Sequence, residues 1–271
     1  MRNMDNGNES CKLNSEELSI LVISYDGAKE LWPPFSQAWK QNWADCPFEI
    51  ILITQSITQL SNSCFDRIIS VPSKATQAIY RIKEALKQIH SNYVLVMCDD
   101  YFLCDKPDEK KLMHIVNMMR EKQISCVHLD NKKNIDKLET EEIKNSNFLV
   151  SGGIPSIYER EFIYMLCEKF SDYTMREWEL SASRWLRKER YVIRNITNSS
   201  FKCYHCVLEG YWRVKPYIWA QKNNFEISFG TYKKPGIIHS VKAIGKAICF
   251  NIVLNIFPKI YDKWSKKRYS K

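Results

Sequence analysis

The chain has 271 residues, is 45% hydrophobic and holds only 8 Gly and 9 Pro, which excludes a disordered or collagen-like protein and supports a sizeable core. Its net charge is +9, but residues 227–271 hold ten Lys or Arg against Asp262 alone, while residues 1–226 hold thirty of each sign. A neutral body with a basic tail disfavours nucleic-acid binding, which stays open only as an alternative.

The ten cysteines do not indicate a disulfide scaffold, because the chain is long and Cys98 and Cys126 fall within apolar runs. Residues 1–17 are polar and lack the apolar stretch of a signal peptide, so we expect a flexible lead and a cytoplasmic protein. The segment Cys203–Cys206 contains a histidine and could suggest zinc, but without a second cysteine pair buried thiols are favoured.

Apolar runs and helical periodicities alternate over the first half of the chain. Strands are expected at 18–24, 48–54, 67–71, 93–97 and 124–129, and helices at 28–44, 75–90 and 108–122. This alternation predicts an α/β fold in which helices cover a mainly parallel central sheet.

The pattern weakens after residue 129. The charged stretch 130–147 is expected to be a surface loop, helices are expected near 157–170 and 176–189, and a strand at 191–194. No linker marks a boundary, so residues 18–226 are expected to form one domain.

Two polar clusters follow predicted strands, Ser24-Tyr25-Asp26 after the first and Asp99-Asp100 after the fourth. Ligands of open α/β sheets bind at the carboxyl ends of the strands. Two adjacent carboxylates at the end of so apolar a strand would repel each other, and a divalent cation, Mg²⁺ or Mn²⁺ with a diphosphate, would remove that penalty. The alternative is that either aspartate merely caps the following turn.

The chain also resembles the GT-A-type glycosyltransferases of bacterial capsular polysaccharide and lipopolysaccharide biosynthesis. In chain order, the matching segments are Leu21–Asp26 with Trp32–Ser36 and Trp43, Tyr93–Leu103, Pro155–Tyr158, and Glu177–Ser181 with Leu208–Trp212. The resemblance implies a GT-A-like (Rossmann-like) three-layer sandwich over residues 18–226. It also implies transfer of a sugar from a nucleotide-diphosphate sugar to a hydroxyl of a glycan acceptor, which for a cell-surface polysaccharide would be lipid-linked.

The resemblance implies roles for individual residues. The donor nucleotide-sugar would be bound by Ser24, Tyr25, Asp26, Arg81, Asp99 and Arg213, and the divalent cation by Asp100 and Asp99. The family's acidic element is usually Asp-X-Asp, whereas here it is Asp-Asp-Tyr, so the identity of the metal ligand is open. A late histidine, here His205, approaches the metal in some related transferases.

An inverting transfer needs a carboxylate base near the acceptor hydroxyl, and Glu177 and Glu179 are the candidates. Glu179 is preferred, because Glu177 lies beside Arg176 and could be satisfied locally. Tyr158 and Trp178, with Trp185, are expected to bind the acceptor; the alternative is that these aromatics are core residues.

Within 227–271, apolar residues recur at helical intervals from Ile237 to Ile256 beside Lys242 and Lys246. This predicts an amphipathic basic helix, too interrupted to span a bilayer, that lies peripherally on the cytoplasmic face of a membrane. The alternative is a helix packed on the body or on a second subunit. The competing enzymatic interpretation is a nucleotidyltransferase, although the Gly-rich basic loop of that class is missing after the first strand.

Overall fold

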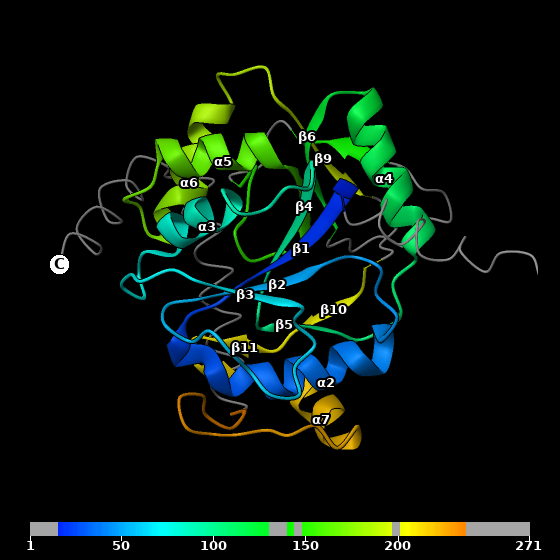
Figure 1. Ribbon diagram of the computed structural model, residues 1–271, viewed down its shortest axis with the longest axis vertical. Coiled ribbons are helices and arrows are strands. Elements are labelled where there is room, and N and C mark those ends of the chain that lie inside the picture. The colour runs from blue at the N-terminus through cyan, green and yellow to red at the C-terminus, as the bar shows by residue number, and fades with distance from the viewer. Residues whose placement is uncertain (1–15, 130–139, 144–147, 197–200, 237–271) are drawn as a thin grey trace, which may run out of the picture.

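The computed structural model describes residues 16–129, 140–143, 148–196 and 201–236. Within these residues, an eight-stranded sheet with the order β3-β2-β1-β4-β8-β6-β9-β7 is covered by helices on both faces (Figure 1). Its strands are β1 (Leu18–Ile23), β2 (Ile50–Thr54), β3 (Arg67–Ser70), β4 (Tyr93–Cys98), β6 (Ile124–His128), β7 (Thr140–Glu142), β8 (Ser156–Glu159) and β9 (Val192–Ile196). The predicted α/β fold with a mainly parallel sheet is confirmed.

The four strands β3, β2, β1 and β4 run parallel, and β1 pairs with β2 on one side and β4 on the other. Every residue of β1 and β2 is buried, because helices cover both faces of a parallel sheet and leave no solvated side. The carboxyl ends of these strands therefore meet at one edge, where Ser24 and Asp99 emerge.

The helix that was expected to begin near residue 157 begins later, because the residues before it form strand β8. Residues 156–159 form a strand antiparallel to β4 and β6, and helix α5 (Arg160–Lys169) begins only at Arg160. A short apolar run such as Ser-Ile-Tyr-Glu fits a strand or a helix start equally well by periodicity. Because β8 runs against its neighbours, the loop before it, residues 148–155, lies at the carboxyl edge of β4.

A second difference concerns the charged stretch 130–147, of which residues 140–143 and no others are described. Thr140–Glu142 form β7, an edge strand antiparallel to β9. Its charged, largely exposed side chains suit a sheet edge, where they discourage pairing with other chains.

The helices and the short strands outside the large sheet complete the described fold. These are the 3₁₀ helix η1 (Asp26–Leu31), α2 (Trp32–Trp43), α3 (Ala78–Leu86), α4 (Glu109–Glu121), α6 (Met175–Leu186) and α7 (Val214–Lys222), with β5 (Tyr101–Leu103), β10 (Cys203–His205), β11 (Val207–Leu208) and β12 (Tyr211–Trp212). Helices α3, α5 and α6 share one apolar cluster, and α2 and α4 contribute to another on the opposite face of the sheet.

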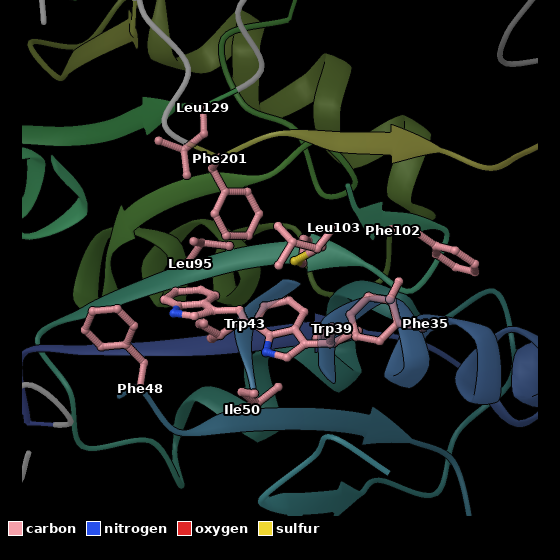
Figure 2. Packing of buried hydrophobic residues seen from close by; sticks show 14 of the residues in the cluster. Phe35, Trp39, Trp43, Phe48, Ile50, Leu95, Phe102, Leu103, Leu129 and Phe201 are labelled. Carbon is pink, nitrogen blue, oxygen red and sulfur yellow. The ribbon is translucent and has the colours of Figure 1, made fainter. Parts of the chain in front are cut away.

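Helix α2 anchors the second cluster through aromatic residues spaced four apart, which fall on one helix face. Phe35 stacks on Trp39 with ring centroids 5.6 Å apart, and Trp39 stacks on Trp43 at 5.5 Å (Figure 2). Burial of each large apolar side chain stabilises the fold by ~1.5–3 kcal/mol relative to exposure. Phe35, Trp39 and Trp43 share this cluster with residues of η1 and β1, so their packing holds η1 and α2 against the sheet.

The chain after α7 returns to the body. The amide of Thr231 donates to Glu30 Oε2 at 2.7 Å, the amide of Lys233 donates to the carbonyl of Gly210 at 2.9 Å, and Tyr232 is buried. Residues 227–233, which were assigned to the tail, thus pack on the domain. The predicted basic helix beyond them falls at 237–271, outside the described residues. No helix in the described ranges is long and apolar enough to cross a membrane.

Candidate functional site

The two adjacent aspartates at the end of β4 have different surroundings. Asp99 is buried, and its Oδ2 accepts hydrogen bonds from Ser24 Oγ at 2.5 Å and Trp32 Nε1 at 3.1 Å. Burial, together with the neighbouring charge of Asp100, raises the pKa of Asp99 to about 7, although both hydrogen bonds oppose the shift. Asp99 therefore faces inward and ties β4 to the end of β1 and the start of α2.

Asp100 points instead toward β10. His205 Nε2 lies 3.1 Å from Asp100 Oδ2, and the imidazole stacks flat on the ring of Tyr101 with centroids 4.7 Å apart. The other carboxylate oxygen, Oδ1, is buried and has no hydrogen-bond partner among the described residues. A buried carboxylate oxygen without a donor is rare and calls for a cation or an ordered water.

The carboxylate of Asp100 fits Mg²⁺ or Mn²⁺, which both take oxygen ligands, and the imidazole of His205 is a nitrogen ligand that suits Mn²⁺ better than Mg²⁺. No group of three or more His, Cys, Asp or Glu side chains in the described part of the chain could hold a metal. A cation here would take its remaining ligands from a bound diphosphate and from water.

Tyr25 and Asp26 follow β1 at the same edge. The ring of Tyr25 covers Gly27 so closely that a Cβ on that glycine would lie 2.5 Å from the ring. The carboxylate of Asp26 accepts the amides of Gln55 at 2.9 Å and Ser56 at 3.1 Å, and the hydroxyl of Ser56 at 2.5 Å. Partial burial opposes ionisation of Asp26, but these hydrogen bonds outweigh it and lower the pKa. Asp26 thus joins the loop after β2 to the end of β1.

Glu179, on α6, meets the loop that precedes β8. Its Oε1 accepts the hydroxyl of Ser151 at 3.0 Å and the amide of Gly152 at 3.3 Å, and Oε2 pairs with Arg176 at 3.3 Å. Burial raises the pKa of Glu179, with Arg176 and Ser151 opposing the shift. The same loop reaches the acidic pair, because the amide of Cys98 donates to the carbonyl of Gly153 at 3.2 Å.

Glu177 has a structural partner. It closes a capping box at the start of α6, in which Glu177 Oε2 accepts the amide of Thr174 at 2.9 Å and Thr174 Oγ1 accepts the amide of Glu177. From the sequence, Glu179 is the expected base because Arg176 lies next to Glu177 and could pair with it. In the structure Arg176 pairs with Glu179 instead, and the side chain of Glu177 is bonded within the capping box.

The two aromatics expected to bind an acceptor are core residues, as the alternative interpretation had it. Both Tyr158 and Trp178 are 0% exposed. The hydroxyl of Tyr158 donates to the carbonyl of Ser151 at 2.6 Å, and the indole of Trp178 donates to the carbonyl of Leu166 at 3.4 Å. Trp185 stacks with Lys169, the ammonium lying 4.9 Å from the ring centroid.

The two arginines expected near phosphate differ in exposure. Arg81 is buried on α3, and its guanidinium donates to the carbonyl of Lys74 at 2.7 Å and to Ser73 Oγ at 3.2 Å. Burial lowers the pKa of Arg81, and its Nε has no hydrogen-bond partner within the described part of the chain. Arg213 is exposed at the N-terminus of α7, where it donates to the carbonyl of His205 at 3.4 Å. Of the two, Arg213 is thus the one that borders the Asp100–His205 pair.

Trp32 and Tyr232 were not predicted as site residues. Burial raises the pKa of Tyr232, with the charges of Asp99 and Tyr25 adding to the shift and a side-chain hydrogen bond joining it to Tyr25. Of the two, Trp32 alone carried a sequence signal, because it lies in the segment Trp32–Ser36 that resembles the glycosyltransferase family. Tyr232 lies at the site because the chain packs back on the domain after α7. No local sequence pattern predicts that packing.

No protein-family model matches the chain, and no curated protein matches it in sequence. Among solved structures it is similar to S. aureus TarS, with a TM-score of 0.43 and 16% identity over 69% of this chain and 36% of the TarS chain. The chain thus spans little more than a third of the length of TarS.

It is also similar to the mannosyltransferase PcManGT from Pyrobaculum calidifontis, solved with GDP-Man and Mn²⁺, with a TM-score of 0.46 and 11% identity over 72% of this chain and 58% of that one. A third similar structure is a UDP-glucose pyrophosphorylase solved with UDP-glucose. Its TM-score is 0.47, with 12% sequence identity over 77% of this chain and 98% of that one. At these TM-scores the similarities do not decide between glycosyl and nucleotidyl transfer.

Proposed function

We propose that the protein is a metal-dependent glycosyltransferase that moves a hexosyl group from a nucleotide-diphosphate sugar to a hydroxyl of a lipid-linked glycan in cell-surface polysaccharide synthesis. The observation that carries the proposal is the Asp100–His205 pair, whose buried carboxylate oxygen has no partner among the described residues, one loop away from the partly buried carboxylate of Glu179. The pair suits a cation and the second carboxylate suits a base. Both lie at the carboxyl edge of the parallel strands, where such folds bind ligands.

The donor would lie over the ends of β1 and β4. Tyr25 offers a half-buried ring beside the nucleotide, and Arg213 offers an exposed guanidinium to a phosphate. Asp99, Ser24 and Asp26 hold the edge together rather than face the donor, because their polar atoms are bonded to protein groups. A divalent cation bound by Asp100 and His205 would neutralise the diphosphate as it leaves.

Glu179 is the proposed base of an inverting reaction. Its carboxylate accepts the proton of the acceptor hydroxyl while that oxygen bonds to the anomeric carbon, and the bond to the nucleoside diphosphate breaks with its electron pair on the diphosphate. Burial raises the pKa of Glu179 and makes it a stronger base than an exposed glutamate, while the hydrogen bond from Ser151 holds it in place.

The test is calorimetric binding of UDP- and GDP-linked sugars with Mn²⁺ or with a chelator, on the native chain and on Asp100→Ala. We expect donor affinity to fall at least tenfold in the variant and in the chelator. Asp172→Ala, at an exposed position outside the site, is the matched control and should bind as the native chain does. Donor binding that ignores both metal and Asp100 would sink the proposal.

Turnover supplies the second half of the test. With Glu179→Gln we expect unchanged donor binding but a loss of sugar transfer and donor hydrolysis of ~10²–10⁴-fold, the usual contribution of a general base. The nucleotidyltransferase alternative predicts instead that a nucleoside triphosphate and a sugar phosphate yield pyrophosphate. Pyrophosphate release without sugar transfer would establish that alternative.

A further inference from the structure

The outer face of α7 combines cations with an exposed aliphatic residue. Lys215, Ile218 and Lys222 are spaced three and four apart, so they share one helix face. All three are exposed, and Ile218 is 45% accessible, the most exposed large hydrophobic residue in the described part of the chain. The buried residues of this helix, Pro216 and Ala220, face the domain.

The segment that follows α7 extends this surface. Phe229 is 36% exposed and packs on Tyr217 of α7 with ring centroids 5.9 Å apart. Lys234 lies 5.3 Å from the ring of Phe229, and the neighbouring Lys233 lies 5.4 Å from the ring of Tyr211. In Figure 1 this segment and α7 lie together at the bottom of the molecule, on the side away from α3, α5 and α6.

We propose that the surface made by Lys215, Ile218, Lys222, Phe229, Lys233 and Lys234, here called the α7 surface, docks on an anionic lipid membrane. Lysines that flank exposed aliphatic and aromatic side chains are the composition of interfacial protein surfaces, in which the apolar groups enter the headgroup boundary and the cations meet lipid phosphates. Residues 201–236 hold six Lys or Arg and two Glu, so the charge of this part of the chain complements an anionic leaflet.

The charge and the apolar residues of the α7 surface also favour a membrane over a basic segment, a second copy of the chain or a nucleic acid. Residues 237–271 hold eight Lys or Arg and one Asp, a net charge of the same sign as that of the α7 surface, so an anionic membrane complements this surface better than a basic segment would. A second copy would present the same cations to its partner. A nucleic acid would match the lysines but would gain nothing from Ile218 and Phe229.

The α7 surface continues to the rim of the candidate site. Arg213 is the N-cap residue of α7 and donates to the carbonyl of His205, so a membrane under α7 lies beside the Asp100–His205 pair. The inference rests on the proposed function in one respect, since a lipid-linked acceptor would be met at this membrane. Docking itself is measurable without sugar transfer, so failure of either proposal can be told from failure of the other.

The experiment is sedimentation of the full chain with vesicles of phosphatidylcholine alone or mixed with phosphatidylglycerol. We expect binding to the mixed vesicles that weakens with salt, and a loss of about tenfold or more in Ile218→Glu/Phe229→Glu and, separately, in the single variant Lys222→Glu. The matched control Tyr173→Glu/Lys188→Glu changes exposed residues beside α5 and α6 and should bind as the native chain does.

Donor binding and thermal melting of each variant confirm that it is folded, and Lys222→Glu, at an exposed position, keeps the test valid where the double variant unfolds. Equal binding of native protein and folded variants to mixed vesicles would overturn the proposal, because residues outside the α7 surface would then supply all the affinity. Equal binding to both vesicle types, or release from mixed vesicles by duplex DNA, would overturn it as well.

Discussion

Asp100 and His205 lie 105 residues apart in the sequence, yet their side chains meet at 3.1 Å. The contact depends on β5 and β10, which pair antiparallel so that His205 lies opposite Tyr101, the residue directly after Asp100. The amide of Cys206 also donates to the carbonyl of Asp100 at 2.8 Å, which fixes the backbone on both sides of the pair. A short accessory ladder thus builds the proposed cation site.

The first prediction concerns this pair. We expect His205→Ala to weaken Mn²⁺ binding ~10–100-fold, the loss typical of removing a group that supports a metal site. Titration of free Mn²⁺ by electron paramagnetic resonance measures this without turnover. His114→Ala removes an exposed histidine on α4 and is the control. Equal Mn²⁺ affinity in the two variants would exclude His205 as a ligand.

The second prediction separates the two glutamates of α6. Glu177→Ala breaks the capping box and should lower the free energy of unfolding by ~1 kcal/mol while sugar transfer continues. Glu179→Gln should show the reverse, loss of transfer without loss of the cap. Urea denaturation and steady-state rates, taken on both variants, decide the matter. If Glu177→Ala abolished transfer in a folded protein, the roles would have to be exchanged.

The third prediction concerns Ser151 as a positioning residue for Glu179. Its hydroxyl donates to the carboxylate at 3.0 Å and so favours the ionised form. A hydrogen bond to a charged group contributes ~1.5–3 kcal/mol, and one pKa unit corresponds to ~1.4 kcal/mol. We therefore expect Ser151→Ala to move the acidic limb of the kcat–pH profile upward by about one pH unit.

Ser151→Thr keeps the hydroxyl, so the acidic limb of its kcat–pH profile should lie at the same pH as in the native protein. The hydroxyl of Ser151 also accepts the amide of Gly153 at 3.2 Å, so some loss of stability is expected in the alanine variant. Stability loss alone would lower the rate at every pH. An unshifted limb would therefore leave Ser151 with a structural role only.

The fourth prediction follows from the buried carboxyl of Asp99, whose pKa burial and the charge of Asp100 raise to about 7. An unfolded aspartate has a pKa of ~3.9, so between about pH 4 and pH 7 the folded protein holds a proton that the unfolded chain has released. The contribution of Asp99 to stability is greatest below that range and is lost as the pH rises through it.

Asp99→Asn removes this dependence. The free energy of unfolding of the native protein minus that of Asp99→Asn should fall by a few kcal/mol between about pH 4.5 and pH 7.5, at up to ~1.4 kcal/mol per pH unit. Urea denaturation at a series of pH values measures it, with the exposed substitution Asp172→Asn as reference. Parallel pH profiles for Asp99→Asn and the native chain would contradict a raised pKa.

The strands of the parallel half were predictable because β1, β2 and β4 are apolar runs bounded by polar residues, a local signal that survives folding. The same signal placed Asp99 and Asp100 at the correct edge. It did not reveal that the two carboxylates point apart, because that depends on Trp32 and His205, which lie 67 and 105 residues from their partners.

The burial of two helix residues and the extent of one strand were unpredictable for the same reason. Arg81 and Trp178 lie on helices whose exposed and buried faces cannot be assigned until the neighbouring elements are known. Arg81 proved buried, with its guanidinium donating to the hydroxyl of Ser73 and the carbonyls of Lys74 and Ala75, and Trp178 proved buried under α5. For Ser156–Glu159 the competing states were a strand and a helix start, and pairing with β4 and β6 decided between them.

The reversed direction of β8 separates the two halves of the site in the covalent chain. The groups proposed to bind the donor follow strands β1 and β4, whereas the loop that contacts Glu179 of α6 leads into β8 and can be lengthened upstream of Ser151 without shifting the register of β4. We therefore expect natural diversification of acceptor choice to be concentrated in insertions before residue 150. The residues after β1 and β4 should change far less among proteins that use the same donor.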